Sequence, residues 1–135
     1  MKRILFFISC GMAALLLTAC SVERLKTEKI RDIEFTVVDD ADIPKEFAEE
    51  ICEREKNVFK MTYEDQGYLY VAEGYGRQET SGYSIEVDSV YETENAVYVR
   101  TNLIGPTDEE KIASKETFPY IVIKIESVDK NVVFQ

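Results

Sequence analysis

The architecture of this chain is clearest in residues 58–75, VFKMTYEDQGYLYVAEGY, where two runs rich in aromatic and β-branched residues flank a short polar segment that ends in Gly67. Runs of this composition are typical of strands, and a polar segment with glycine is typical of a turn. A connection this short favours antiparallel neighbours. The stretch therefore predicts two antiparallel strands, over residues 58–63 and 68–75.

The same pattern continues toward the C-terminus. Further strands are predicted over residues 83–91, 96–102, 120–126 and 132–134. Upstream, Ile33, Phe35 and Val37 alternate with polar residues, which predicts one more strand with a single buried face. We expect an α+β fold, namely a mostly antiparallel sheet or small sandwich of about six to seven strands with one amphipathic helix near its N-terminus.

That helix is predicted from Pro44 to about Asn57. Proline suits the first turn of a helix, and the acidic residues just before it favour the positive end of the helix dipole. One side is expected to pack because it carries Phe47, Ile51, Cys52, Glu55 and Phe59 at helical spacing. The Cys52 thiol should then be buried. The other side should be solvated because it carries Glu46, Glu49, Glu50 and Glu53.

Residues 1–19 have the organisation of an export signal. A basic tip, Lys2 and Arg3, precedes an apolar stretch over residues 4–17 that is too short to span a membrane. The following Leu17-Thr18-Ala19-Cys20 resembles the processing site of a bacterial lipoprotein, although an ordinary secretory signal could also end beside a cysteine. We expect a lipoprotein signal peptide over 1–19, lipidation at Cys20, an anchor and tether over 20–31, and one globular domain over 32–135. The domain would be held at the extracytoplasmic side of the cell membrane.

Composition argues against several classes of function. The chain carries 26 acidic and 16 basic residues, a net charge of −10, which disfavours nucleic acid and an anionic bilayer surface as partners. It contains no histidine that could activate a lone cysteine, so we expect a protein that is not an enzyme. Asp39, Asp40 and Asp42 lack the turn glycine and further oxygen ligands of a calcium loop. Gly74-Tyr75-Gly76 lacks the third glycine and the helix of a dinucleotide loop, so neither metal nor cofactor is expected.

Three segments carry a resemblance to a known family: Gly82-Tyr83-Ser84, Asn102-Leu103-Ile104-Gly105-Pro106 and the stretch from Phe118 to Lys124, FPYIVIK. Over roughly residues 63–134 they resemble the C-terminal domain family of PrcB, a subunit of a cell-surface protease complex. The turn departs from the family's usual Pro-Thr-Gly-Gly, since Glu79 and Ser81 replace the proline and the first glycine. The resemblance implies a non-catalytic accessory domain, often carried on lipoproteins.

Loops held by a rigid sheet are common recognition sites. The residues predicted to contact a partner are Gln78, Glu79, Thr80, Ser81 and Gly82 in one turn, and Gly105 and Pro106 in another. Glu79 and Thr80 should be exposed, and Tyr83 should begin a strand. We expect a membrane-anchored binding module for a protein partner, as an accessory subunit or regulator of an exported protease. The alternative is a structural or envelope-maintenance lipoprotein with no protease partner.

Overall fold

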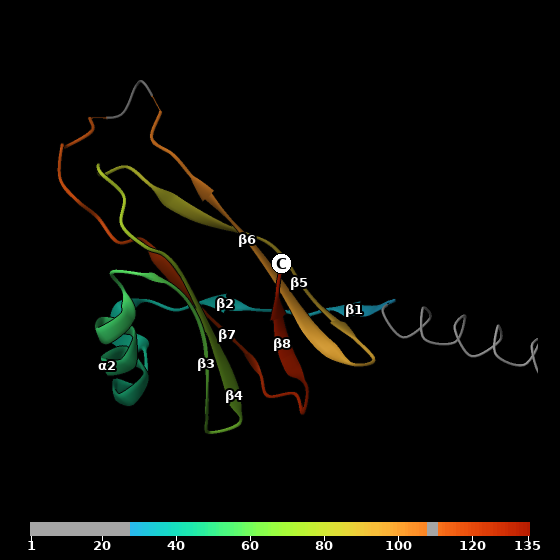
Figure 1. The fold of residues 1–135 in the computed structure, drawn as a ribbon. Coiled ribbons are helices and arrows are strands. Elements are labelled where there is room, and N and C mark those ends of the chain that lie inside the picture. The colour runs from blue at the N-terminus through green and yellow to red at the C-terminus, as the bar shows by residue number, and fades with distance from the viewer. Residues whose placement is uncertain (1–27, 108–110) are drawn as a thin grey trace, which may run out of the picture.

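The chain folds into two four-stranded sheets and one α-helix in the computed structural model, which describes residues 28–107 and 111–135 (Figure 1). The strand orders are β1-β5-β6-β8 and β2-β7-β4-β3. Neighbouring strands are antiparallel except for β6 and β8, which are parallel. The predicted mostly antiparallel β architecture is confirmed, although this part of the chain has eight strands rather than six to seven.

The first sheet consists of β1 (Lys29–Asp32), β5 (Ser84–Thr93), β6 (Ala96–Ile104) and β8 (Asn131–Phe134). The second consists of β2 (Thr36–Val37), β7 (Tyr120–Glu126), β4 (Tyr68–Tyr75) and β3 (Val58–Asp65). A short 3-10 helix, η2 (Asp40–Asp42), and the helix α2 (Lys45–Arg54) lie between β2 and β3. The strands predicted at 68–75 and 120–126 have the observed bounds, and the stretch 58–75 forms the β3–β4 hairpin.

The N-terminal stretch predicted as one strand belongs to two sheets. β1 pairs with β5 and β2 pairs with β7, so the chain between them crosses from one sheet to the other. Ile33, at the crossing, is buried, whereas Phe35 and Val37 are exposed. The prediction that this stretch is one strand with a single buried face is therefore wrong. Alternate side chains face the same core only while the strand stays in one sheet, and here the chain changes sheets. β1 also begins at Lys29, inside the predicted tether.

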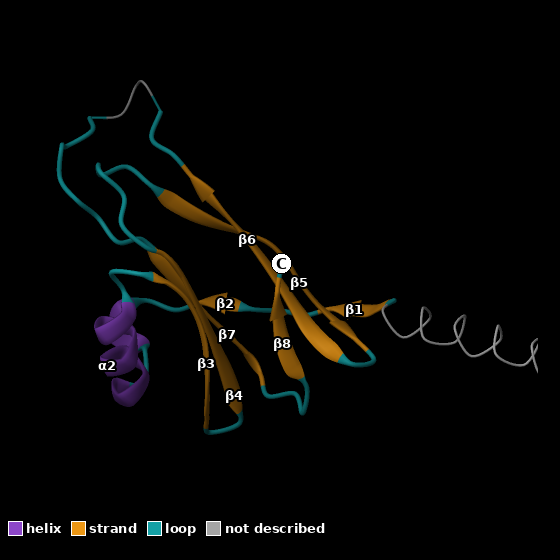
Figure 2. Cartoon of the chain, viewed as in Figure 1, coloured by secondary structure: helices purple, strands orange, loops and turns teal. Residues whose placement is uncertain are grey.

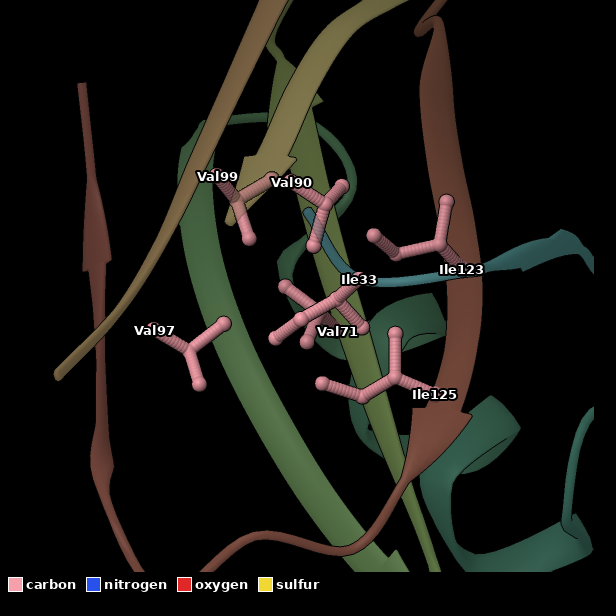
Figure 3. Close-up of a cluster of buried hydrophobic side chains, with 7 residues drawn as sticks. All are labelled: Ile33, Val71, Val90, Val97, Val99, Ile123 and Ile125. Atoms are coloured by element: carbon pink, nitrogen blue, oxygen red, sulfur yellow. The ribbon is translucent and has the colours of Figure 1, made fainter. Parts of the chain in front are cut away.

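The main hydrophobic core lies between the two sheets (Figure 3). It consists of Ile33, Val71, Val90, Val97, Val99, Ile123 and Ile125. Strands β4 and β7 bury both of their faces, because Val71 and Ile123 point into this core while Ala72 and Val122 belong to a second cluster beneath the helix. Burial on both faces explains why these two strands are nearly continuous apolar runs.

Helix α2 covers the other face of the second sheet. Phe47 and Ile51 are fully buried against this sheet, and the Phe47 ring stacks on Tyr63 with 5.3 Å between centroids. Phe59, which spacing had assigned to the packed side of the helix, lies in β3 and joins the same cluster from the sheet. The four glutamates predicted to be solvated are exposed: Glu46, Glu49, Glu50 and Glu53.

Cys52 is exposed, so the prediction that its thiol is buried is wrong. Successive helical residues are rotated by about 100°, which places Cys52 about 140° around the axis from Phe47. The helix turns a narrow face toward the sheet, and its buried residues are Phe47 and Ile51. Cys52 lies beyond the edge of that face.

We therefore expect a maleimide to label Cys52 in the folded domain almost as fast as in the denatured chain, because exposure leaves the sulfur open to attack. Stopped-flow labelling of a protein that starts at residue 21 measures both rates. The matched control combines Cys52→Ser with Ile51→Cys, whose thiol should react only on unfolding since Ile51 is 2% exposed. Protection of Cys52 in the native protein would contradict the exposed position.

Gly74 makes room for the Phe59 ring across the β3–β4 pair. The two residues are partners in the register, and a Cβ on Gly74 would lie 2.2 Å from Cε1 of Phe59. That separation is far inside van der Waals contact. The ring thus occupies the space that any other residue at position 74 would need.

Gly74→Ala should lower the free energy of unfolding by about 1–3 kcal/mol, the usual cost of overpacking a core. Urea denaturation checks the value. In a double-mutant cycle with Phe59→Leu, the two losses should sum to more than the loss in the double variant, because leucine lacks the ring atoms nearest Gly74. If the two losses of stability were simply additive, contact with the Phe59 ring would not be the reason that Gly74→Ala destabilises the domain.

A buried glutamate ties three segments together. Glu92 in β5 is 8% exposed and accepts hydrogen bonds from Lys130 Nζ at 2.6 Å and Arg31 Nε at 2.7 Å. Lys130 also donates to the carbonyl of Thr93 at 2.9 Å. The hydrogen bond from Lys130, followed by that from Arg31, lowers the pKa of Glu92 below its ordinary value of 4.5.

Because this pKa is lower in the folded state, ionised Glu92 stabilises the fold above about pH 4.5, and the contribution is lost as the pH falls through the folded pKa. Glu92→Gln should therefore lose less stability than the wild type between about pH 5 and pH 3. Urea midpoints across this range measure the difference. Glu94→Gln, an exposed neighbour, should keep the wild-type dependence. Equal losses in the wild type and Glu92→Gln would rule out this ion-pair network.

Candidate functional site

The two turns predicted to contact a partner lie at the same end of the domain (Figure 2). Residues 76–83 connect β4 to β5, and residues 105–119 connect β6 to β7. The described parts of both connections, residues 76–83, 105–107 and 111–119, lie on the side away from β1 and are drawn in teal at the upper left of the view. The predicted lipidation site, Cys20, lies outside the described residues.

The first turn is bound to residues 113–117 by hydrogen bonds. Gln78 and Thr117 form an antiparallel bridge, with N···O distances of 2.8 and 3.0 Å. The Ser81 amide donates to the Ala113 carbonyl at 3.1 Å, and the Ala113 amide donates to Ser81 Oγ at 2.9 Å. The Thr117 hydroxyl donates to the carbonyl of Thr80 at 2.7 Å. The predicted turn is thus one half of a two-segment unit.

The predicted residues differ in exposure. Glu79, Gly82 and Gly105 are exposed, whereas Gln78, Thr80, Ser81 and Pro106 are half-buried. The expectation that Thr80 is exposed is therefore wrong, because its carbonyl accepts from Thr117 and its hydroxyl donates to the Ser81 carbonyl at 3.1 Å. The turn offers solvent the carboxylate of Glu79 and the backbone of Gly82.

Tyr83 brings the two turns together. A Cβ on Gly105 would lie 3.8 Å from Cε1 of Tyr83, so the second turn passes beside this ring. Tyr83 directly precedes β5, which begins one residue later than predicted, at Ser84. Ser84 in turn pairs with Ile104, which fixes the ends of the β5–β6 hairpin beside both turns.

Sequence reasoning missed residues 113–117, the partner of the first turn. Besides the backbone bridge, an ion pair between Arg77 and Glu116 joins the same two segments. Neither connection carries a sequence signal, because both depend on where a long loop returns. Arg77 and Glu116 have opposite charges, but the sequence does not show that these two residues, among the chain's many charged residues, form a pair.

A buried polar group below the site was also missed. The Thr101 hydroxyl in β6 donates to Glu73 Oε2 in β4 at 2.8 Å and hydrogen bonds with the Tyr75 hydroxyl. Glu73 and Thr101 are each 7% exposed, so this group joins the two sheets through buried hydrogen bonds. Alternation along β4 could have placed Glu73 on the inner face, but its partner is known only from the fold.

Two tyrosines with raised pKa values lie near the helix rather than in the turns. Burial, followed by the 2.9 Å hydrogen bond to Asp40, raises the pKa of Tyr120 to about 12. A hydrogen bond to Glu46 raises the pKa of Tyr63. Residues 78–82 and 105–106 offer hydroxyls, amides and the exposed carboxylate of Glu79, which suit hydrogen bonding to a protein surface.

Two further findings concern residues 28–107 and 111–135. They contain no cluster of three or more His, Cys, Asp or Glu residues suited to a metal ion. None of their helices has the length and apolar character needed to cross a bilayer.

The effect of substitutions in the first turn on the free energy of unfolding should depend on the backbone conformation at each position. Gly82 has φ of +92°, a conformation that strains residues with a Cβ, so Gly82→Ala should cost about 1 kcal/mol or more. Glu79→Ala, at an exposed side chain, should change the free energy of unfolding by less than about 0.5 kcal/mol. Urea denaturation of both variants checks the contrast. A neutral Gly82→Ala would mean that the turn relaxes freely.

Residues 69–126 match the family model described as PrcB C-terminal. The match begins in β4 and ends in β7, so it includes the β5–β6 hairpin and both turns of the candidate site. No curated protein and no solved structure matches the chain. Residues 69–126, which carry the candidate site, thus belong to the PrcB C-terminal family.

Proposed function

We propose that this protein is a membrane-anchored, non-catalytic lipoprotein that binds a protein partner through the surface formed by residues 78–82 and Gly105–Pro106. The observation that carries the proposal is the meeting of these two turns, distant in sequence, within the segment that matches the family. Hydrogen bonds from residues 113–117 hold the first turn in place. A turn that is already ordered loses less conformational entropy on binding.

The proposed partner is an exported protease, to which this protein is an accessory subunit or regulator. The resemblance to a domain of a protease-complex subunit supports this choice. The complete absence of histidine supports a non-catalytic role, since the exposed Cys52 has no imidazole base available. The exposed Glu79 gives the surface one negative charge that a basic patch on the partner could match.

The proposed anchor is a lipid on Cys20. Eight residues lie between Cys20 and Lys29, where β1 begins, and the nine Cα–Cα steps between these two positions reach at most about 30 Å when fully extended. The domain would therefore act close to the extracytoplasmic surface of the membrane. A diacyl anchor is consistent with the acidic composition, because two chains hold a protein that the bilayer surface repels.

Cys20→Ser should remove the protein from the membrane fraction or leave an uncleaved precursor. Fractionation and mass spectrometry of the mature N-terminus measure both outcomes. Cys52→Ser is the matched control and should stay membrane-bound, since its exposed thiol plays no part in anchoring. Normal processing and membrane retention of Cys20→Ser would exclude the lipoprotein.

The binding surface is tested by charge reversal. Glu79→Lys should lower recovery of the partner after cross-linking and purification from detergent-solubilised membranes, with the captured protein identified by mass spectrometry. Glu94→Lys changes the charge equally at an exposed glutamate in the turn at the opposite end of the β5–β6 hairpin, and should leave recovery unchanged. Equal recovery by both variants would remove the turn as the binding site. Recovery of envelope proteins without a protease would favour the envelope-maintenance role instead.

A further inference from the structure

Among the described residues, no strand lies on one side of β6 beyond Val99. β8 pairs with residues 96–99 of β6, and the Gln135 amide donates to the Val99 carbonyl at 2.9 Å. β6 continues to Ile104 with β5 on its other side only (Figure 1). In the described part of the chain, residues 100–104 therefore form a sheet edge without a neighbouring strand.

The backbone groups at this edge follow from the pairing. Along a strand, alternate residues direct both N–H and C=O to the same side. The Val99 carbonyl points toward β8, so Thr101 and Leu103 also point outward. The open edge thus presents two donors and two acceptors at the spacing of a β-ladder, which an extended peptide can satisfy.

The opposite edge of this hairpin is less suitable for adding a strand. β5 has a bulge between Val87 and Ser89, and it carries the acidic residues Glu86 and Asp88. Bulges and charges are the devices that keep sheet edges from pairing. The β6 edge is regular, and its one charged residue, Arg100, is 3.7 Å from the Asp88 carboxylate.

The second sheet also lacks a cover at this place. Lys60 of β3 lies with its Nζ 5.8 Å from the centre of the Phe134 ring in β8. Val58 is two residues away on the same face of β3 and pairs with Tyr75, at the end of β4 where the candidate site begins. Val58 is nevertheless 69% exposed, the largest exposed fraction among the described large hydrophobic residues. A strand that continued the line of β8 along β6 would cover it.

We propose that an extended segment of the partner protein adds to the first sheet along Arg100–Ile104, in line with β8, and places an apolar side chain over Val58. This mode of contact rests on the proposed function, since a segment on this edge would end beside Gly105 at the candidate site. Main-chain hydrogen bonds would supply the affinity. The apolar side chain over Val58 would supply the selectivity. Five residues span about 17 Å, so the turns would enlarge an otherwise small interface.

The occupant is a segment of another protein rather than a second copy of this chain. The net charge of −10 makes two copies repel each other. Pairing of two β6 edges would also bring together two hairpins that each carry Glu86 and Asp88. A neutral or basic segment with alternating β-branched residues fits the edge better.

The probe is the acetylated, amidated peptide KTVTVTK, titrated into the isotope-labelled, lipidated mature protein in detergent micelles. Saturable NMR shifts are expected for the Thr101 and Leu103 amides and the Val58 methyl groups, with amide exchange at Leu103 slowed at least tenfold. The same peptide N-methylated at its central amides should not bind, because it lacks the donors. Shifts confined to other residues, or equal binding of the methylated peptide, would overturn the proposal.

Val58→Lys should weaken peptide binding at least tenfold, whereas Ile30→Lys should leave it unchanged. Ile30 is the matched control because it is 60% exposed on the edge strand β1. Unchanged urea midpoints establish that both variants are folded, and equal peptide affinities would contradict the role of Val58. Sedimentation that shows dimers with Leu103 protected in the absence of peptide would assign the edge to a second copy and overturn the choice of occupant.

The two proposals can fail separately. If Glu79→Lys loses the partner while the peptide does not bind, the edge proposal fails and the proposed function stands. If Val58→Lys loses the partner and the peptide, while Glu79→Lys retains both, the edge is the recognition site and the role assigned to the turn fails.

Discussion

The whole structure depends on two strands that bury both of their faces. β4 and β7 lie side by side in full register, with Val71 opposite Ile123 on the face toward the first sheet and Ala72 opposite Val122 on the face toward the helix. A domain of this size gains most of its stability from removing apolar surface from water. The first sheet and the helix are held in place because each covers one face of this central pair.

The central pair also determines where the turns lie. Gly76 follows β4 with φ of +73°, and a Cβ there would meet the backbone of Val58 at 3.2 Å. The chain therefore leaves β4 at a defined angle, and the turn that follows is hydrogen-bonded to residues 113–117, which lead into β7. The Tyr75 amide donates to the Pro119 carbonyl at 3.0 Å and closes this arrangement at the start of β7. The first loop of the candidate site thus begins on β4 and the second ends on β7, the two strands of the central pair.

Local patterns predicted the parts of the fold that one segment determines alone. The β3–β4 hairpin, β7 and the solvated side of α2 each follow from the composition and spacing of one short continuous segment. Phe35, Val37 and Cys52 were assigned less well because their surroundings depend on distant partners: the crossing between sheets for Phe35 and Val37, and the width of the helix contact for Cys52. The two turns were predicted as connections between strands, but the pairing of residues 113–117 with the first turn was not, since only the tertiary contacts with Gln78 and Ser81 give these residues a structural role.

The crossing at Ile33 has a consequence for how the chain folds. The N-terminal segment supplies an edge strand to each sheet, and Thr36 in β2 pairs with Lys124, near the other end of the chain. Neither edge can close until the strands that follow it by dozens of residues are present, and loops of that length make closure entropically slow. A chain that emerges N-terminus first would therefore hold β1 unpaired until β5 has emerged and β2 unpaired until β7 has emerged, so both sheets would be completed late.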